Sequence, residues 1–161
     1  MSKIVNYGIV GCGMMGQEHI HNIALLDGAR VSVVYDPVPE LAQAAAGIAK
    51  GAHVAASLDD LLAFDALDAL VIVSPNHLHV AQLRQIAAKR SLPILGEKPL
   101  YTAPEDAAVI EAFSQDYAAP VWVAMEYRYM PPIAALVSRA AQVTGGVKML
   151  TIREHRFPFL P

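Results

Sequence analysis

Short apolar runs alternate with longer segments of helical periodicity along most of this sequence. The run at 69–73, Ala-Leu-Val-Ile-Val, contains no polar residue, and continuous apolar runs of that length are typical of parallel strands covered on both faces. Strand-length runs that alternate with helix-length segments indicate repeated βαβ units. The chain is therefore predicted to be an α/β protein with a doubly wound parallel sheet.

Six strands and five helices are expected in the first 125 residues. The strands are expected at 4–10, 30–35, 52–54, 69–73, 93–96 and 121–125, and the helices at 14–26, 38–50, 58–64, 77–90 and 104–117. Two helices carry starting signals, because Ser57 and Asp60 have capping-box spacing and Pro104 suits a first turn. The pattern then changes: a polar, proline-containing segment at 126–132 leads to another helix, and 147–157 alternates like a strand.

The composition disfavours two classes of partner. The chain has 161 residues, of which 55% are hydrophobic and 17% charged, with a formal net charge of -3. No apolar run approaches the roughly 18 to 20 residues that a membrane-spanning helix needs, and the scattered Lys and Arg residues form no basic patch for nucleic acid. Cys12 is the single cysteine and the N-terminus lacks the pattern of a secretory signal, so a cytoplasmic location is expected.

A glycine-rich run follows the first predicted strand and opens the first predicted helix. Its sequence is Gly11-Cys12-Gly13-Met14-Met15-Gly16, the G-x-G-x-x-G pattern of dinucleotide-binding loops. Gly11 allows a tight turn, Gly13 lets the backbone approach a pyrophosphate, and Gly16 lets the helix lie close to the strand. The pyrophosphate would then lie at the positive end of the helix dipole. The alternative is a strand-to-helix turn without a ligand.

An acid closes the second predicted strand at the position where such loops bind a ribose. Asp36 lies 20 residues after Gly16, and its carboxylate can accept hydrogen bonds from the ribose hydroxyls of adenosine. Because a carboxylate repels a 2′-phosphate, NAD is expected rather than NADP. Without a cofactor, Asp36 and Pro37 would start an ordinary turn. Cys12 is expected to fill the loop as a small residue; a redox thiol at the helix N-terminus is the alternative.

Unusual polar segments follow the last three predicted strands. They are Ser74-Pro75-Asn76-His77-Leu78-His79, Gly96-Glu97-Lys98-Pro99 and Glu126-Tyr127-Arg128-Tyr129. Because ligands of open parallel sheets bind outside the carboxyl ends of the strands, these segments should converge on the edge that carries the glycine-rich loop. Asn76 and His77 would there contact a cofactor or cap a helix.

Lys98 is the residue expected to act in chemistry. A lysine near a carbonyl group can polarise it or take part in proton transfer. Glu97 beside it could orient the lysine or tune its pKa, and the alternative is a surface ion pair between the two side chains. Because proline follows Lys98, a cis Lys98-Pro99 peptide bond is also possible. No metal is expected, because the histidines of His19-x-His21 and His77-x-His79 would face nearly opposite sides of a helix.

Together these motifs closely resemble the glucose-fructose oxidoreductase and inositol dehydrogenase family (Gfo/Idh/MocA), and Glu97-Lys98-Pro99 is the most specific of them. The resemblance implies a Rossmann-type domain and an NAD(P)-dependent dehydrogenase of sugars, polyols or related hydroxy compounds. It makes Lys98 the active-site lysine. It implies dinucleotide contacts for Gly11, Gly13, Gly16 and Asp36, with Ser74, Pro75 and Asn76 beside the nicotinamide half. The candidate cofactor-binding residues also include Cys12, Met14, Met15, His77, Glu97 and Lys98.

Two departures from the family pattern limit the resemblance. Family members often have Asn-x-Arg after the sixth strand, where this chain has Glu126-Tyr127-Arg128, so only Arg128 carries over as a cofactor contact. Family members are also usually about twice as long, with a second, mainly antiparallel domain that supplies a catalytic histidine, and His155 does not match its motif. Residues 1–125 are therefore expected to be the NAD-binding domain, and residues 126–161 the crossover helix and first strand of an incomplete substrate domain.

Two functions remain open from the sequence. The first is the cofactor-binding part of an oxidoreductase that transfers hydride between NAD(P) and a sugar, polyol or related hydroxy compound, with little or no turnover expected from this chain alone. The second is a non-catalytic nucleotide-binding or redox-sensing module that pairs with another chain through the strand at 147–157, which leaves a homo-oligomer open. A methyltransferase with a similar glycine loop would not explain Glu97-Lys98-Pro99.

Overall fold

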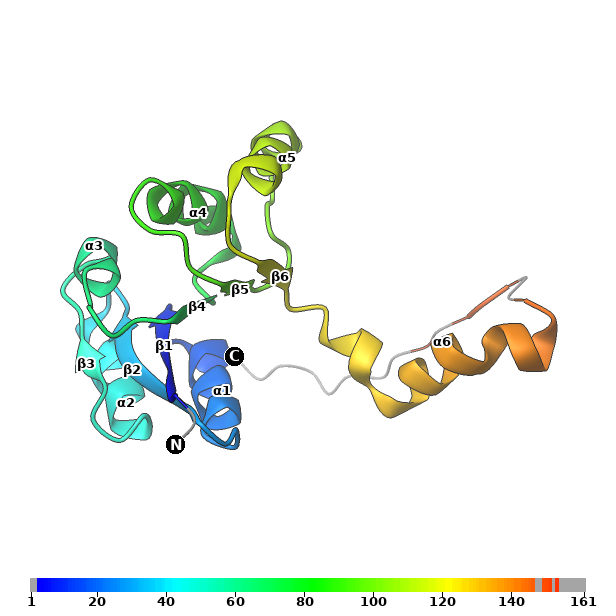
Figure 1. Ribbon diagram of the computed structural model, residues 1–161, viewed down its shortest axis with the longest axis horizontal. Coiled ribbons are helices and arrows are strands. Elements are labelled where there is room, and N and C mark those ends of the chain that lie inside the picture. The colour runs from blue at the N-terminus through cyan, green and yellow to red at the C-terminus, as the bar shows by residue number, and fades with distance from the viewer. Residues whose placement is uncertain (1–2, 147–148, 152, 154–161) are drawn as a thin grey trace. The chain divides into compact units, whose positions relative to one another are not determined.

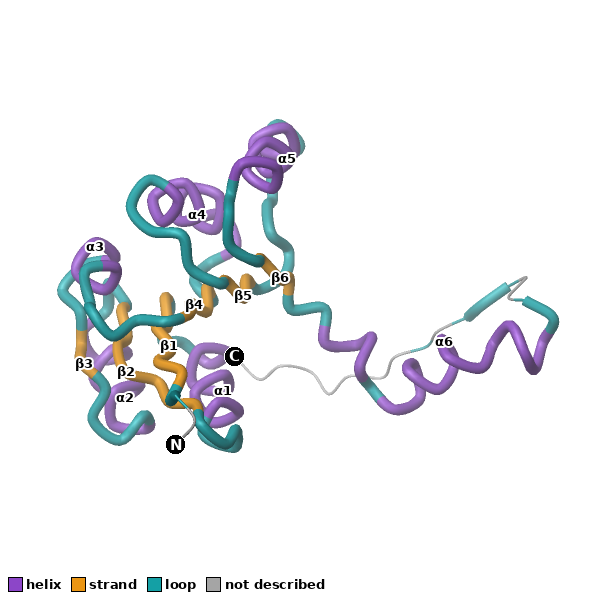
Figure 2. The backbone as a smooth tube through the Cα atoms, in the orientation of Figure 1, coloured by secondary structure: helices purple, strands orange, loops and turns teal. Residues whose placement is uncertain are grey.

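The computed structural model describes residues 3–146, 149–151 and 153, and the chain divides into two units, Met1–Ala124 and Met125–Pro161. Over these residues the first unit forms one sheet of six strands: β1 (Val5–Val10), β2 (Ala29–Tyr35), β3 (His53–Val54), β4 (Ala69–Ile72), β5 (Ile94–Gly96) and β6 (Val121–Val123). Their order is β3-β2-β1-β4-β5-β6 (Figure 2), and every neighbouring pair is parallel. The predicted doubly wound parallel sheet is confirmed.

Helices cover both faces of this sheet (Figure 1). They are α1 (Met14–Ile23), α2 (Pro39–Ile48), α3 (Leu58–Leu62), α4 (His79–Ala87) and α5 (Asp106–Asp116), with a short 3-10 helix, η1 (Asn76–Leu78), before α4. Side chains from α1 and α2 form the core on one face, and side chains from α3, α4 and α5 form the core on the other. From β1 the strand order runs to β3 in one direction, and from β4 it runs to β6 in the other. Because the βαβ connections are right-handed, this reversal places helices on both faces of the sheet.

The central strand β4 shows why its sequence is apolar without interruption. Leu70 and Ile72 belong to the core under α3 and α4, whereas Val71 belongs to the core under α1 and α2. All four residues of β4 are buried. Since successive side chains of a strand point to opposite faces, a strand covered on both faces needs an apolar residue at every position.

Several local predictions needed correction at helix ends, and the helix predicted over 14–26, for example, ends at Ile23 as α1. The segment predicted as one helix over 77–90 is η1 followed by α4, which ends at Ala87. Ser57 caps α3 by accepting a hydrogen bond from the Asp60 N–H at 3.0 Å, but Asp60 accepts from the Ala56 N–H instead of completing the capping box. Pro104 lies in the turn before α5 rather than in its first turn, because α5 begins at Asp106.

The second unit contains a 3-10 helix and one α-helix within the described residues: η2 (Glu126–Tyr129) and α6 (Pro131–Thr144). Gly145 ends α6 in the left-handed conformation, with a φ of 68°. The strand predicted over 147–157 lies mainly outside the described residues, and 149–151 and 153 have no regular secondary structure. Among the helices of the described ranges, none combines the length and apolar character needed to cross a membrane.

Candidate functional site

The carboxyl ends of β1 and β4 lie side by side at the point where the strand order reverses. The Val73 N–H donates to the Val10 carbonyl at 2.8 Å, and a Cβ on Gly11 would lie 2.6 Å from the Ser74 backbone nitrogen. Gly11 also has a φ of 101°, a conformation that residues with a side chain rarely adopt. Gly11 therefore allows the close approach of the two strand ends, and an open α/β sheet binds its ligand at this reversal.

The other two glycines of the loop have different surroundings. A Cβ on Gly16 would lie 2.2 Å from the Gly11 carbonyl oxygen, so the lack of a side chain lets α1 approach the loop. A Cβ on Gly13 would meet no protein atom within 4 Å, and its φ of -68° with a ψ of -164° is open to alanine. The protein itself does not require glycine at position 13. The free space in front of Gly13 is what a pyrophosphate needs in order to approach the backbone.

Asp36 holds the glycine-rich loop as well as facing the cleft. Its Oδ2 accepts a hydrogen bond from the Cys12 N–H at 2.7 Å, and its Oδ1 accepts one from the Val38 N–H at 2.9 Å. A carboxylate can accept about four hydrogen bonds, so two remain for ribose hydroxyls. The sequence predicts the ribose contact, and the bond to the loop is an additional role that it does not predict.

Cys12 is fully buried in the core beneath α1 and α2. Burial, followed by the nearby Asp36 carboxylate, raises the pKa of its thiol from the ordinary 9.0 to about 12. The thiolate is the reactive form of cysteine. This environment favours the expected space-filling role and opposes a redox function.

We expect Cys12 to react slowly in the folded protein. A rise of the pKa from 9.0 to about 12 lowers the thiolate fraction at pH 8 about a thousandfold, and burial restricts access further. Absorbance with Ellman's reagent should show almost no reaction in buffer and one equivalent in guanidinium chloride. Fast reaction in buffer would restore the redox-sensing alternative.

His79 connects the segment after β4 to the segment after β5. Its side chain is buried, with Nε2 3.0 Å from the Ser74 carbonyl oxygen and Nδ1 2.9 Å from the Pro99 carbonyl oxygen. A carbonyl oxygen can only accept, so a neutral imidazole donates to one of the two carbonyls, according to its tautomer, and an imidazolium donates to both. The Ser74 hydroxyl in turn donates to Gln82 of α4 at 2.5 Å. His79 is thus a structural link that the sequence pattern does not predict.

Glu97 makes two contacts at the end of β5, and neither is with the Lys98 ammonium. Its Oε1 lies 3.0 Å from His19 Nε2 on α1, and its Oε2 accepts from the Lys98 backbone N–H at 3.1 Å. The Lys98 side chain is exposed and forms no hydrogen bond or ion pair within the described residues. The Lys98-Pro99 peptide bond is cis. The structure therefore disfavours the surface ion pair that the sequence left open.

A cleft of about 540 Å³ at this edge of the sheet contains most of the predicted site. The predicted residues that line it are Gly11, Gly13, Met14, Met15, Asp36, Ser74, Pro75, Asn76, Glu97 and Lys98. The unpredicted ones are Val10, Tyr35, Pro37, Val38, Leu41, Val73, Leu78 and Gln82. The sequence does contain a signal for Val38 and Leu41. They follow Asp36 with i, i+3 spacing, which places both side chains on one face at the start of α2.

Four predicted residues do not line this cleft. Cys12 and Gly16 lie in the loop and in α1, where they support the cleft from beneath. His77 is exposed on η1, and neither η1 nor α4 has a side-chain cap, so capping by Asn76 or His77 is not observed. Arg128 belongs to the second unit, where its guanidinium lies 5.9 Å from the centroid of the Tyr129 ring. Its cofactor contact stays a prediction.

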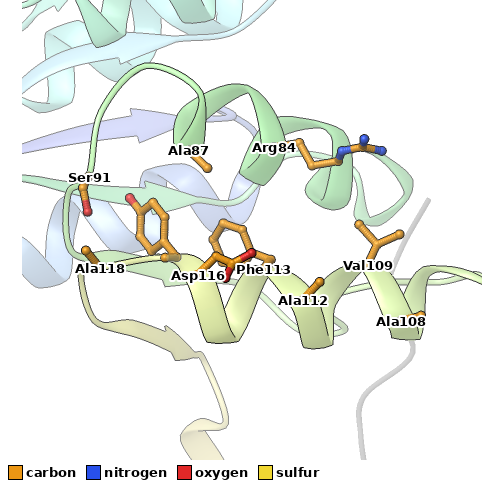
Figure 3. Close-up of a pocket in the computed structure, with 10 residues that line it drawn as sticks. Arg84, Ala87, Ser91, Ala108, Val109, Ala112, Phe113, Asp116 and Ala118 are labelled. Carbon is orange, nitrogen blue, oxygen red and sulfur yellow. The ribbon is translucent and has the colours of Figure 1, made fainter.

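A larger hollow of about 730 Å³ lies between α4 and α5, away from the carboxyl ends of the strands (Figure 3). Its wall combines Phe113 and several alanines with Arg84 on α4 and Asp116 on α5. The glycine-rich loop, Asp36 and Lys98 take no part in it. We assign the functional site to the smaller cleft, because ligands of open parallel sheets bind at the carboxyl ends of the strands.

No metal site accompanies the cleft in the part of the chain that the structure describes. No three His, Cys, Asp or Glu side chains come together there in an arrangement that could hold a metal ion. The partly buried imidazole of His19 and the buried imidazole of His79 face protein oxygen atoms instead.

Comparison with known proteins identifies the family to which this geometry belongs. Residues 5–125 match the model of an oxidoreductase family with an NAD-binding Rossmann fold, that of glucose-fructose oxidoreductase and inositol dehydrogenase. The chain belongs to this family. Inositol 2-dehydrogenase of Corynebacterium glutamicum (strain R) is 34% identical over 160 residues, which cover 98% of this chain and 47% of that protein. The rhizopine catabolism protein MocA of Rhizobium meliloti is 30% identical over 129 residues, 80% of this chain and 40% of that protein.

Solved structures of the oxidoreductase family have the same fold. The myo-inositol dehydrogenase of Lactobacillus casei, in complex with NAD(H) and myo-inositol, has a TM-score of 0.82 and 30% identity, covering 89% of this chain and 43% of that one. The WlbA dehydrogenase of Bordetella pertussis, in complex with NADH and UDP-GlcNAcA, has a TM-score of 0.78 and 28% identity, covering 87% and 42%. The chain spans about half the length of the curated relatives it matches. The predicted family and its NAD-binding Rossmann domain are confirmed.

Proposed function

We propose that this polypeptide is the NAD-binding part of a dehydrogenase that acts on a sugar, a polyol or a related hydroxy compound. The observation that carries the proposal is the space in front of Gly13, because the protein has no packing reason of its own for glycine there. The names of the relatives, which include inositol 2-dehydrogenases, support a polyhydroxylated substrate. A cytoplasmic location is part of the proposal, since the single cysteine allows no internal disulfide.

The cleft residues fit the parts of NAD in order along the edge of the sheet. The first-turn N–H groups of α1 and the open backbone at Gly13 suit the pyrophosphate. Asp36 suits the adenosine ribose, and the apolar side chains of Val38 and Leu41 beside it suit the adenine ring. Across the reversal of the strand order, Pro75 and the segment around it suit the nicotinamide half.

Lys98 is the proposed catalytic residue of the cleft. Its ammonium has no partner among the described residues, so it is available to donate a hydrogen bond to a substrate hydroxyl or carbonyl oxygen. When bound, NAD supplies the hydride acceptor. Residues 126–161 are proposed as the crossover helix and beginning of the domain that covers the substrate.

Gly13→Ala tests this function with one methyl group. The variant should fold with a melting temperature within about 3 °C of the wild type, because its Cβ meets no protein atom and its backbone conformation suits alanine. Its dissociation constant for NAD should rise at least about tenfold, because the methyl group occupies the space for the pyrophosphate. Isothermal titration calorimetry with NAD measures the change.

Gly47→Ala is the matched control for this experiment. Gly47 lies on α2, is exposed, does not line the cleft, and has no protein atom within 4 Å of a Cβ. Its replacement should leave the affinity for NAD unchanged. If the wild type does not bind NAD, or if Gly13→Ala binds it as tightly as the wild type, the proposed function is wrong.

A further inference from the structure

The backbone on both sides of Lys98 is linked to a histidine, although the Lys98 side chain has no partner of its own among the described residues. On one side, the Pro99 carbonyl oxygen lies 2.9 Å from His79 Nδ1. On the other side, the Glu97 carboxylate connects the Lys98 backbone N–H to His19. A flexible four-carbon side chain takes its position from its backbone, so these links determine where the ammonium can reach.

The link through His19 has the geometry of a directed hydrogen bond. Glu97 Oε1 lies 3.0 Å from His19 Nε2, and the two side chains are 11% and 16% exposed. A carboxylate can only accept, so Nε2 must carry the proton. The other oxygen of Glu97 accepts from the Lys98 backbone N–H at 3.1 Å. A nearly buried carboxylate needs such donors because water reaches it poorly.

We propose that His19 is a positioning residue for Lys98, which it holds at the cleft through the Glu97 carboxylate. This inference rests on the proposed function, in which Lys98 faces the substrate. His19 lies on α1, directly after the glycine-rich loop, whereas Lys98 follows β5. The link therefore couples the helix that begins at the pyrophosphate site to the residue proposed for chemistry.

His19 also keeps the Glu97 carboxylate from pairing with the Lys98 ammonium. With one oxygen on His19 and the other on the Lys98 backbone N–H, the carboxylate makes no ion pair with the Lys98 ammonium. Without His19, Oε1 would have no donor, and the ammonium of the next residue could replace it. The ammonium would then be withdrawn from the cleft, and the Lys98 backbone would move with it.

Substitutions on α1 test the proposal. His19→Leu removes the donor, whereas His19→Gln keeps an N–H donor at a similar reach. His21→Leu is the matched control, because His21 lies on the same helix, is exposed, and makes no hydrogen bond or ion pair within the described ranges. The amide proton shift of Lys98, measured by NMR without NAD, reports the bond to Glu97, and calorimetry gives the affinity for NAD.

His19→Leu should shift the Lys98 amide resonance upfield. It should also weaken NAD binding about three- to tenfold, because Lys98 is also a candidate cofactor contact and its displacement would remove about one hydrogen bond to NAD. His19→Gln should restore most of the amide shift and most of the affinity for NAD. His21→Leu should match the wild type in both measurements. Glu97→Gln should shift the same amide, and combining it with His19→Leu should add little.

Three results would overturn the proposal. They are an unchanged Lys98 amide in folded His19→Leu, a His19→Gln variant that behaves like His19→Leu, and additive effects of His19→Leu and Glu97→Gln. If His19→Leu does not fold, the amide shifts of His19→Gln and Glu97→Gln decide: a wild-type amide in Glu97→Gln overturns the proposal. Failure of the wild type to bind NAD would instead remove the proposed function, while the amide shift still reports on His19.

Discussion

Gly16→Ala is expected to lower the stability of the protein by about 2 to 4 kcal/mol and its melting temperature by about 5 to 15 °C. Helix propensity alone predicts the opposite, because alanine is favoured over glycine by about 1 kcal/mol inside a helix such as α1. The new Cβ, however, would lie 2.2 Å from the Gly11 carbonyl oxygen. A backbone atom of the loop cannot rotate away as a side chain can, so α1 or the loop must shift.

Thermal unfolding followed by circular dichroism measures this effect, and Gly47→Ala is again the control. Gly47 is also helical, but a Cβ there meets nothing within 4 Å, so its replacement should leave the protein as stable or up to about 1 kcal/mol more stable. Affinity for NAD should fall in Gly16→Ala, because the loop of the pyrophosphate site has moved. An unchanged melting temperature in Gly16→Ala would show that α1 does not contact the loop as the structure describes.

His79→Leu is expected to lower the free energy of unfolding by about 2 to 3 kcal/mol. Leucine fills a similar volume but donates no hydrogen bond to the Ser74 and Pro99 carbonyl oxygens. Ser74 is buried, so its carbonyl would be left without a donor, whereas Pro99 is exposed and water can replace the imidazole there. Urea denaturation curves of the two proteins measure the difference.

His77→Gln is the control, because His77 is two residues away, exposed, and forms no hydrogen bond with the described residues. Its stability should stay within about 0.5 kcal/mol of the wild type, as is usual for surface positions. If His79→Leu were as stable as His77→Gln, the buried imidazole would contribute packing alone. The hydrogen bonds between the two segments would then contribute nothing measurable to the free energy of unfolding.

Much of the fold was predictable because its signals are local. An apolar run such as Ala69–Val73 reports burial on both faces, and the glycine-rich run with Asp36 reports the first βαβ unit. Helix ends were predicted less well, as at Pro104 and Ala87, because tertiary contacts move a boundary by a few residues.

Site residues were predictable where the residue type and its local motif indicate the role. They were not predictable where the role depends on a partner that is distant in the sequence. Adjacency in the sequence predicts that Glu97 acts on Lys98, but the Glu97 side chain also reaches His19, 78 positions away in the sequence. The sequence presents His79 as half of a histidine pair, whereas in the structure it lies between the Ser74 and Pro99 carbonyl oxygens. Spacing within one helix or strand predicts the face on which a side chain lies, but it does not predict which loop packs against that face.

By itself, the sequence determined the parallel α/β sheet, the glycine-rich loop with its acid, and the family, because each depends on residues close together in the chain. The tertiary structure alone decided that Gly13 is free of protein contacts while Gly16 is not, and that His19 and His79 hold the two sides of Lys98. The physical reason is the strand order: β1, β4 and β5 are neighbours in the sheet, and their ends bring together residues that the chain keeps far apart.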